Sequence, residues 1–317
     1  MQPRERFMKA LERKPLKGLV PHFELVYFLT MEKFRKVHPA HRHYHQWDQM
    51  SEKERQLHRH DMADLYIDTA KAYDHSAIFI HQNPGTLEEI MKIVEIIREK
   101  TGDTYFLMVH GDATYGIPNG EQLQQFIYRI ADEPEKVKQE AANMVNQALE
   151  NAQILQKHGG LDGFALCADY CFNVGPFLSP DMMSEFVIPY LAKLIQGYRD
   201  LGFYTIKHTD GNIMPILDQL VQTNPHALHS LDPQGGIDMA QVKKLVGDKV
   251  CLIGNVNCGL MQTGTEEEVI ASTRYALQHG MPGGGYIFST SNCVFTGMDI
   301  KRYEMVVDVW KKEGIYR

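Results

Sequence analysis

The residues that most directly suggest chemistry lie at 203–212, where a strand-like apolar run ends in His208, Asp210 and Gly211. In a parallel α/β protein, side chains just beyond the carboxyl end of a strand face the crevice in which ligands bind. His208 and Asp210 are two residues apart, so both can point to the same side of an extended backbone. Cys293 follows a later strand-like run. Imidazole, carboxylate and thiolate together suit Zn²⁺, so these three residues are predicted to ligate a metal; the spacing also fits a metal-free site.

Short apolar runs alternate with longer helical patterns along the chain, which indicates a parallel sheet. The predicted strands are Leu19–Glu24, Ser76–Ile80, Tyr105–His110, Gly163–Cys167, Phe203–His208, Ala227–Leu231, Val250–Gly254 and Gly285–Ser289. The predicted helices are Glu52–Tyr73, Thr86–Lys100, Pro134–His158, Pro180–Leu201, Ile213–Val221, Met239–Val246, Glu266–His279 and Asp299–Glu313. Eight strands alternating with helices favour a (β/α)₈ TIM barrel formed by a single domain, 1–317. A doubly wound sheet is the alternative, but no Gly-rich dinucleotide loop follows the first strand.

Polar residues follow nearly every predicted strand, and a barrel gathers such residues on one face. They include Glu24, His81, His110, Asp169, Tyr170 and Asn255. Turn chemistry alone explains an Asp or Asn at a strand end, whereas His is not a turn former. The set is therefore predicted to converge on one site.

Composition excludes several classes of protein. The net charge of −7 argues against a nucleic-acid partner. We expect no membrane span and no secretory leader, because the first residues contain no apolar run. Five Cys residues in a chain this long do not make a disulfide framework. These features predict a cytoplasmic protein with reduced thiols, and they leave a homodimer open.

A His-rich segment at about 36–60 joins the first predicted strand to the first long helix. It contains six His residues, at positions 38, 41, 43, 45, 58 and 60. A connection of this length predicts a lid over the barrel mouth, whose aromatic and His side chains close on a ligand. Adventitious metal binding is the alternative.

Motifs along almost the whole chain resemble the uroporphyrinogen decarboxylase superfamily, which also contains cobalamin-dependent methyltransferases. They are Pro3–Phe7, Gly163–Asp169, Gly175–Pro180, Lys207–Gly211, Gly254–Val256, Gly264–Val269 and Gly284–Ser289. The haem-pathway decarboxylase carries an arginine-rich motif that holds porphyrinogen carboxylates. Here the corresponding region, 20–28, contains Glu24 and no Arg. The resemblance is therefore closer to the methyltransferase branch.

The zinc enzymes of that branch use His-x-Cys and a second Cys, so the resemblance matches His208 to one ligand and Cys293 to another. Asp210 stands where the first Cys would be, so the ligand set is harder, in the sense that a carboxylate oxygen is less polarisable than a thiolate. The resemblance implies a methyltransferase or demethylase acting on a small-molecule substrate, with zinc and with a corrinoid supplied by a partner protein. His208 with Asp169 or Glu24 would be catalytic. His81, His110, Tyr170 and Asn255 would bind substrate. The alternatives are a uroporphyrinogen-type decarboxylase and a non-catalytic corrinoid- or tetrapyrrole-binding module.

Overall fold

A curled parallel sheet forms the centre of the computed structural model, which describes residues 1–43 and 45–317. Its seven strands are β2 (Ala77–Ile80), β3 (Phe106–His110), β4 (Gly163–Leu166), β7 (Tyr204–Thr209), β8 (Ala227–Ser230), β9 (Cys251–Val256) and β10 (Tyr286–Thr290). They lie in the order β10-β9-β8-β7-β4-β3-β2, so each strand of this sheet neighbours the sheet's next strand along the chain. Seven of the eight predicted strands are confirmed, and the fold is the predicted TIM barrel.

The first predicted strand, Leu19–Glu24, is wrong as a regular strand. Leu19 pairs with Ile315 outside the main sheet, and beyond it only a single bridge forms, between His22 and Phe288. Pro21 explains this, because it has no N–H to donate to a ladder. The segment nevertheless joins the two edges of the sheet: the carbonyl of Pro21 accepts from the Phe288 amide at 2.9 Å, and that of His22 accepts from the Ser76 amide at 2.6 Å. Residues 21–23 therefore take the place of the eighth strand.

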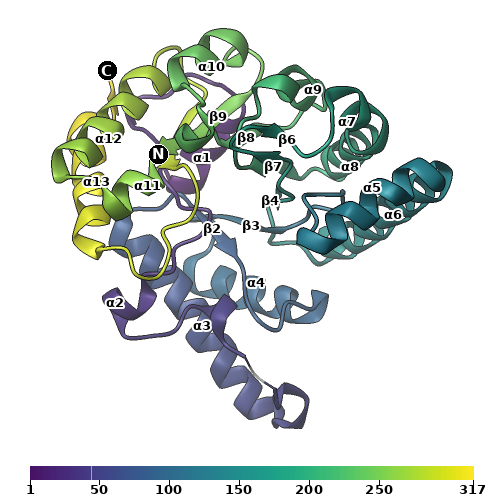
Figure 1. Cartoon of the computed structure of the whole chain (residues 1–317). Helices are drawn as coiled ribbons and strands as arrows, with labels where there is room; N and C mark the ends of the chain where they lie inside the picture. Colours follow the sequence, from purple (N-terminus) through teal and green to yellow (C-terminus); the bar gives the residue numbers. More distant parts are fainter. Residues whose placement is uncertain (44) are drawn as a thin grey trace.

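Helices surround the sheet (Figure 1). They are α1 (Pro3–Leu11), α2 (Thr30–Phe34), α3 (Glu52–Tyr73), α4 (Leu87–Thr101), α5 (Gly120–Asp132), α6 (Pro134–His158), α7 (Pro180–Phe186), α8 (Ile188–Asp200), α9 (Leu217–Gln222), α10 (Met239–Val246), α11 (Cys258–Thr263), α12 (Glu266–Gly280) and α13 (Ile300–Glu313). Two antiparallel strand pairs lie outside the barrel, β1 (Gly18–Leu19) with β11 (Ile315–Tyr316) and β5 (Cys171–Phe172) with β6 (Gly175–Pro176). No helix among the described residues is long and apolar enough to cross a membrane.

Local sequence signals set several helix boundaries. Ser51 and Thr265 each form a complete capping box at the start of α3 and α12. The predicted helix Pro180–Leu201 is instead two helices, divided at Val187. Pro189 lies in the first turn of α8, where the missing N–H costs nothing, and it could not continue α7 without losing a hydrogen bond.

Two apolar layers hold the barrel together. The larger layer lies between the sheet and its helices, and the smaller one fills the barrel interior. Helix α1 closes the amino-terminal end of the interior, where the ring of Phe7 lies 5.2 Å from that of Phe23 and 4.8 Å from that of Phe106. This packing leaves the carboxyl ends of the strands as the face on which polar groups can gather.

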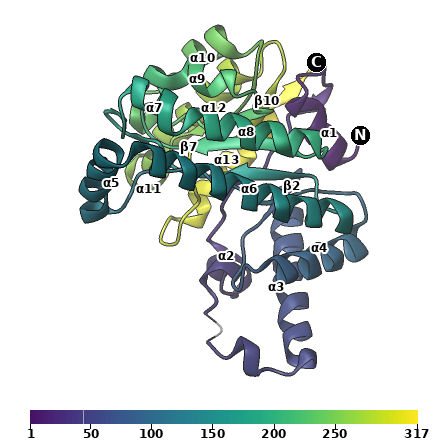
Figure 2. The same cartoon turned by 90° about the vertical axis from the view of Figure 1, so that its right-hand side faces the viewer.

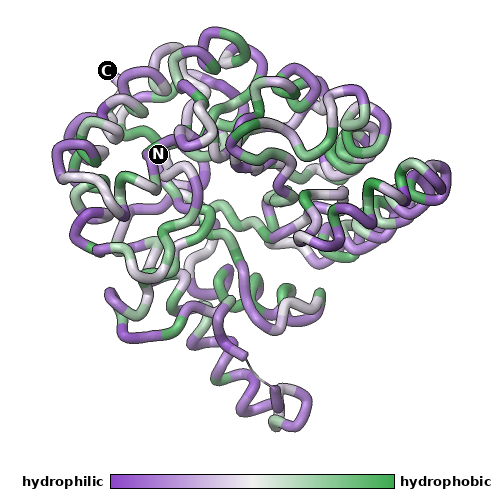
Figure 3. Tube along the Cα trace, in the orientation of Figure 1, coloured by the Kyte–Doolittle hydropathy of each residue, from purple (hydrophilic) through white to green (hydrophobic). Residues whose placement is uncertain are grey.

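The predicted lid at 36–60 divides into two parts. His38 and His41 stay beside the barrel and pack against Phe28, with ring centroids 4.9 and 4.1 Å apart. The short helix Trp47–Gln49 and the first half of α3 instead project from the side of the barrel as a hydrophilic arm (Figures 1, 2 and 3). The buried Arg59 fixes the base of the arm through paired hydrogen bonds of 2.7 Å to Glu89 of α4. Tyr44 lies outside the described residues.

Candidate active site

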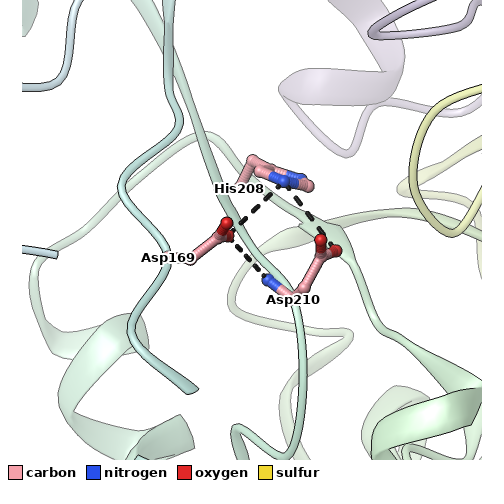
Figure 4. A group of neighbouring side chains, drawn as sticks. All are labelled: Asp169, His208 and Asp210. Atoms are coloured by element: carbon pink, nitrogen blue, oxygen red, sulfur yellow. Dashed lines mark hydrogen bonds and ion pairs between the residues drawn. The ribbon is translucent and has the colours of Figure 1, made fainter. Parts of the chain in front are cut away.

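Three of the predicted site residues converge at the carboxyl ends of β4 and β7 (Figure 4). His208 belongs to β7, Asp210 follows it, and Asp169 lies beyond the end of β4, the neighbouring strand. His208 Nε2 lies 3.7 Å from Asp169 Oδ1 and 3.8 Å from Asp210 Oδ1. The amide of Asp210 donates to Asp169 Oδ1 at 3.1 Å, which ties the two loops together. The imidazole thus faces two carboxylates at once.

Asp210 is a partly buried carboxyl group with two other carboxylates nearby. Burial raises the pKa of Asp210 to about 7, and the negative charges of Asp169 and Asp232 add to the effect. Two donors orient the carboxylate: Ser230 Oγ donates to Oδ1 at 2.6 Å, and the Asn292 amide donates to Oδ2. Burial lowers the pKa of His208 to about 4, so the imidazole is neutral near pH 7. A neutral imidazole is the form that ligates a metal.

The donor set fits a divalent metal. The ligand atoms of Asp169, His208 and Asp210 all lie within 4.8 Å of one another. Two oxygens and one nitrogen suit Zn²⁺ and other first-row divalent ions better than they suit soft ions. Ser230 and Asn292 supply the outer hydrogen bonds that usually orient a ligating carboxylate. Asp169 is the exposed member, with a side chain 46% accessible, so an open coordination position would face the solvent side.

The structure does not bring Cys293 into this group. Among the described residues, the group of side chains with metal-binding spacing consists of Asp169, His208 and Asp210, so it contains Asp169 and not Cys293. The segment instead reaches the site through Asn292, whose amide contacts Asp210. Burial and the charge of Asp210 raise the pKa of Cys293, which keeps the thiol protonated. The third side chain grouped with His208 and Asp210 is therefore Asp169, which the sequence had suggested for catalysis.

A buried ion pair fixes the loop that carries Asp169. Lys207 Nζ donates to Asp112 Oδ2 at 2.8 Å and to the carbonyl of Ala168 at 2.7 Å. Burial alone would raise the pKa of Asp112, but the neighbouring ammonium holds it below its usual value. Tyr170 lies beneath this ammonium, 3.8 Å from ring centroid to Nζ, and its amide donates to Thr209 Oγ1 at 2.8 Å. Asp169 is thus held between two anchored residues.

The predicted substrate-binding residues occupy different places. Tyr170 is fully buried and acts as packing under Lys207. His81 lines a 30 Å³ cavity together with Glu24 and His38. His110 and Asp112 line a 230 Å³ cavity beside α4 and α6. Asn255 is buried, donates to the carbonyl of Leu231 at 2.9 Å and borders a 520 Å³ cavity at the rim. Among the described residues, His81, His110 and Asn255 thus border three different cavities.

Glu24 is buried beside the end of β10. It accepts hydrogen bonds from Ser289 Oγ at 3.1 Å and from Thr290 Oγ1 at 2.5 Å. Burial raises the pKa of Glu24 to about 8. The sequence missed the link between this carboxyl group and His208, which runs through His229 in β8. Its signal was a His inside an otherwise apolar strand, at the same register position as His208.

The comparisons with known proteins confirm the predicted family. A family model described as uroporphyrinogen decarboxylase (URO-D) matches residues 66–313, so the chain belongs to this family. A uroporphyrinogen decarboxylase from Thioalkalivibrio sulfidiphilus is 25% identical over 151 residues, 44% of this chain and 40% of that protein. One from Chlorobium phaeovibrioides is 28% identical over 144 residues, 43% of this chain and 39% of that protein. The matches thus span about two fifths of the curated relatives.

Among solved structures, a methyltransferase from Methanosarcina mazei is similar over nearly the full length of both proteins. The TM-score is 0.75 at 16% identity, and the match covers 98% of this chain and 99% of that chain. At this identity the likeness shows a shared fold.

Proposed function

We propose that this protein transfers a methyl group to or from a small-molecule substrate, with a metal held by Asp169, His208 and Asp210 and a corrinoid carried by a partner protein. The observation that carries the proposal is the cluster itself, a buried neutral imidazole 3.7 and 3.8 Å from two carboxylate oxygens at the carboxyl ends of the barrel strands. The full-length likeness to a solved methyltransferase supports it.

Each residue of the cluster has a separate role. A bound metal, with zinc as our first choice, would polarise the heteroatom that gains or loses the methyl group. His208 is buried and held from behind by His229, so its ring orientation is fixed. Ser230 and Asn292 hold Asp210. Asp169 is the most accessible of the three, so it is better placed than the buried Glu24 to orient a substrate beside the metal.

A decarboxylase of the uroporphyrinogen type is the second candidate, favoured by the family model and by the names of the curated relatives. Such a substrate carries many carboxylates and needs cationic anchors. The groups gathered at this site are instead acidic. The charges of Asp112 and Asp169 act on His208, and those of Asp169 and Asp232 act on Asp210. Lys207 is already paired with Asp112. The charge balance favours methyl transfer.

Methylcobalamin can stand in for the corrinoid protein in the decisive assay. Purified protein is incubated with methylcobalamin and a panel of thiol, amine and hydroxyl acceptors, and in the reverse direction with cob(I)alamin and methylated thioethers, amines and ethers. The corrinoid absorption spectrum reports methyl gain or loss. We expect turnover that His208→Ala abolishes and that His158→Ala, at a partly exposed histidine on α6, leaves intact.

Two results would overturn the proposal. Release of CO₂ from uroporphyrinogen, without turnover of any methyl donor, would establish the decarboxylase. Tight corrinoid binding that survives His208→Ala, with turnover of neither kind, would establish the non-catalytic binding module.

A further inference from the structure

A continuous line of buried side chains connects Glu24 to His208. His208 Nδ1 lies 2.7 Å from His229 Nδ1, and His229 Nε2 lies 3.4 Å from Ser289 Oγ. Ser289 Oγ in turn lies 3.1 Å from Glu24 Oε2. The four residues come from β7, β8, the end of β10 and the irregular first strand. Each is at most 7% exposed, so water does not compete for these contacts.

The carboxyl group of Glu24, at one end of this line, determines the direction of every hydrogen bond in it. An ionised carboxylate only accepts, so Ser289 donates its hydroxyl proton to Glu24. The Ser289 oxygen then accepts from His229, which must carry its proton on Nε2. A neutral imidazole has one N–H, so His229 Nδ1 is an acceptor and His208 Nδ1 must be the donor. The lone pair of His208 is left on Nε2, the nitrogen that faces Asp169 and Asp210.

The hydrogen bonds from His208 to Glu24 can keep the same direction when Glu24 is protonated, because Thr290 can accept the Glu24 proton in a hydrogen bond. Its Oγ1 lies 2.5 Å from Glu24 Oε2 and also 3.0 Å from the carbonyl of Asn292. A proton on Glu24 can therefore be donated to Thr290 Oγ1, whose own hydroxyl proton goes to Asn292. Glu24 Oε2 keeps a lone pair for Ser289 in this arrangement.

We propose that Glu24 is a positioning residue that acts through Ser289 and His229 to hold His208 in its Nδ1–H tautomer, with the Nε2 lone pair aimed at the metal position. The inference rests on the proposed metal site for its purpose, but the tautomers themselves can be observed without a metal. The reversed line would place a proton on His208 Nε2, which would have to be removed before that nitrogen could bind an ion. Glu24 thus prepares a ligand that it does not touch.

Ring-nitrogen chemical shifts of isotope-labelled histidine distinguish an N–H from a lone pair and test the proposal on metal-free protein. We expect His208 protonated on Nδ1 and His229 on Nε2, with signals assigned by their loss in His208→Gln and His229→Gln. In Ser289→Ala both histidines should become mixtures of tautomers. Ser291→Ala is the matched control, because Ser291 is equally buried two residues away and the side-chain contacts described for it are with Cys258.

Zinc affinity provides the second readout. Removing an outer hydrogen bond of a metal-binding His lowers the metal affinity by roughly 10–100-fold. We expect about 10-fold in Ser289→Ala, because the contact that it removes, between Ser289 and His229, is the longest of the line. Ser291→Ala should bind zinc like the wild type in a calorimetric titration. His208 protonated on Nε2 in the wild type, or identical tautomers in the two Ser variants, would overturn the inference. The expected tautomers in a protein that binds no zinc would support the Glu24 line and refute the metal site.

Discussion

Glu24 should make the stability of the metal-free protein depend on pH, and Glu24→Gln should remove that dependence. Burial raises the pKa of Glu24 from 4.5 to about 8, so the folded state holds a proton that the unfolded state releases. The folded-state pKa is the higher one, which means that this contribution is complete below pH 4.5 and is lost as pH rises through about 8. Gln does not titrate and has nearly the same shape.

The useful window lies above pH 6.5. Below it, buried histidines such as His22 and His208, whose pKa burial lowers to about 4, produce the opposite slope. One pKa unit corresponds to about 1.4 kcal/mol, so the free energy of unfolding of the wild type should fall relative to Glu24→Gln by about 2 kcal/mol between about pH 6.5 and pH 9. Taking the difference between the two proteins cancels the titration of Asp210 and of the thiols.

Urea unfolding of EDTA-treated protein at several pH values measures this difference. The expected plot falls through the window and flattens above it. A difference that stays constant across the window would refute the assignment of a raised pKa to Glu24, and one that grows with pH would reverse its sign.

Three further predictions concern the site and the core. Zinc affinity should rise about tenfold per pH unit up to about pH 7 and level off above it, because a proton on Asp210, whose pKa burial raises to about 7, competes with the metal; calorimetric titrations that show no pH dependence would contradict this. Lys207→Met should lower the free energy of unfolding by about 3–5 kcal/mol, because it leaves Asp112 charged and buried, and a loss below about 1 kcal/mol in urea unfolding would show that the pair is not structural. Phe7→Ala should cost about 3–5 kcal/mol, since Phe7 packs on Phe23 and Phe106 at the closed end of the barrel, whereas Met8→Ala, at a half-buried position in the same helix, should cost less.

Periodicity predicted the barrel well because seven of its strands are buried on both faces and follow short, continuous apolar runs. It failed at the first strand, where Pro21 removes a donor that a regular ladder needs, so that beyond Leu19 only the His22 bridge remains. It also missed helix α1, which packs across the end of the barrel through Phe7. That position depends on tertiary contacts that local sequence does not record.

The site was predictable only in part for a related reason. Strand endings identified His208, Asp210 and Asp169, because those residues leave neighbouring parallel strands at the same edge. His229 was invisible to that argument, since it lies inside a strand and contributes through a sideways contact with His208. Such contacts depend on the register of two strands, and register is set by the assembled sheet.

The metal content of untagged protein, prepared without a metal column, tests the central claim most directly. Elemental analysis would compare the wild type with Asp169→Asn and Cys293→Ala, because the structure places the carboxylate in the cluster and leaves the thiol outside it. We predict one metal ion per chain in the wild type and in Cys293→Ala, and its loss in Asp169→Asn. Metal that is retained in Asp169→Asn but lost in Cys293→Ala, or a metal-free wild type with full methyl-transfer activity, would contradict the proposed site.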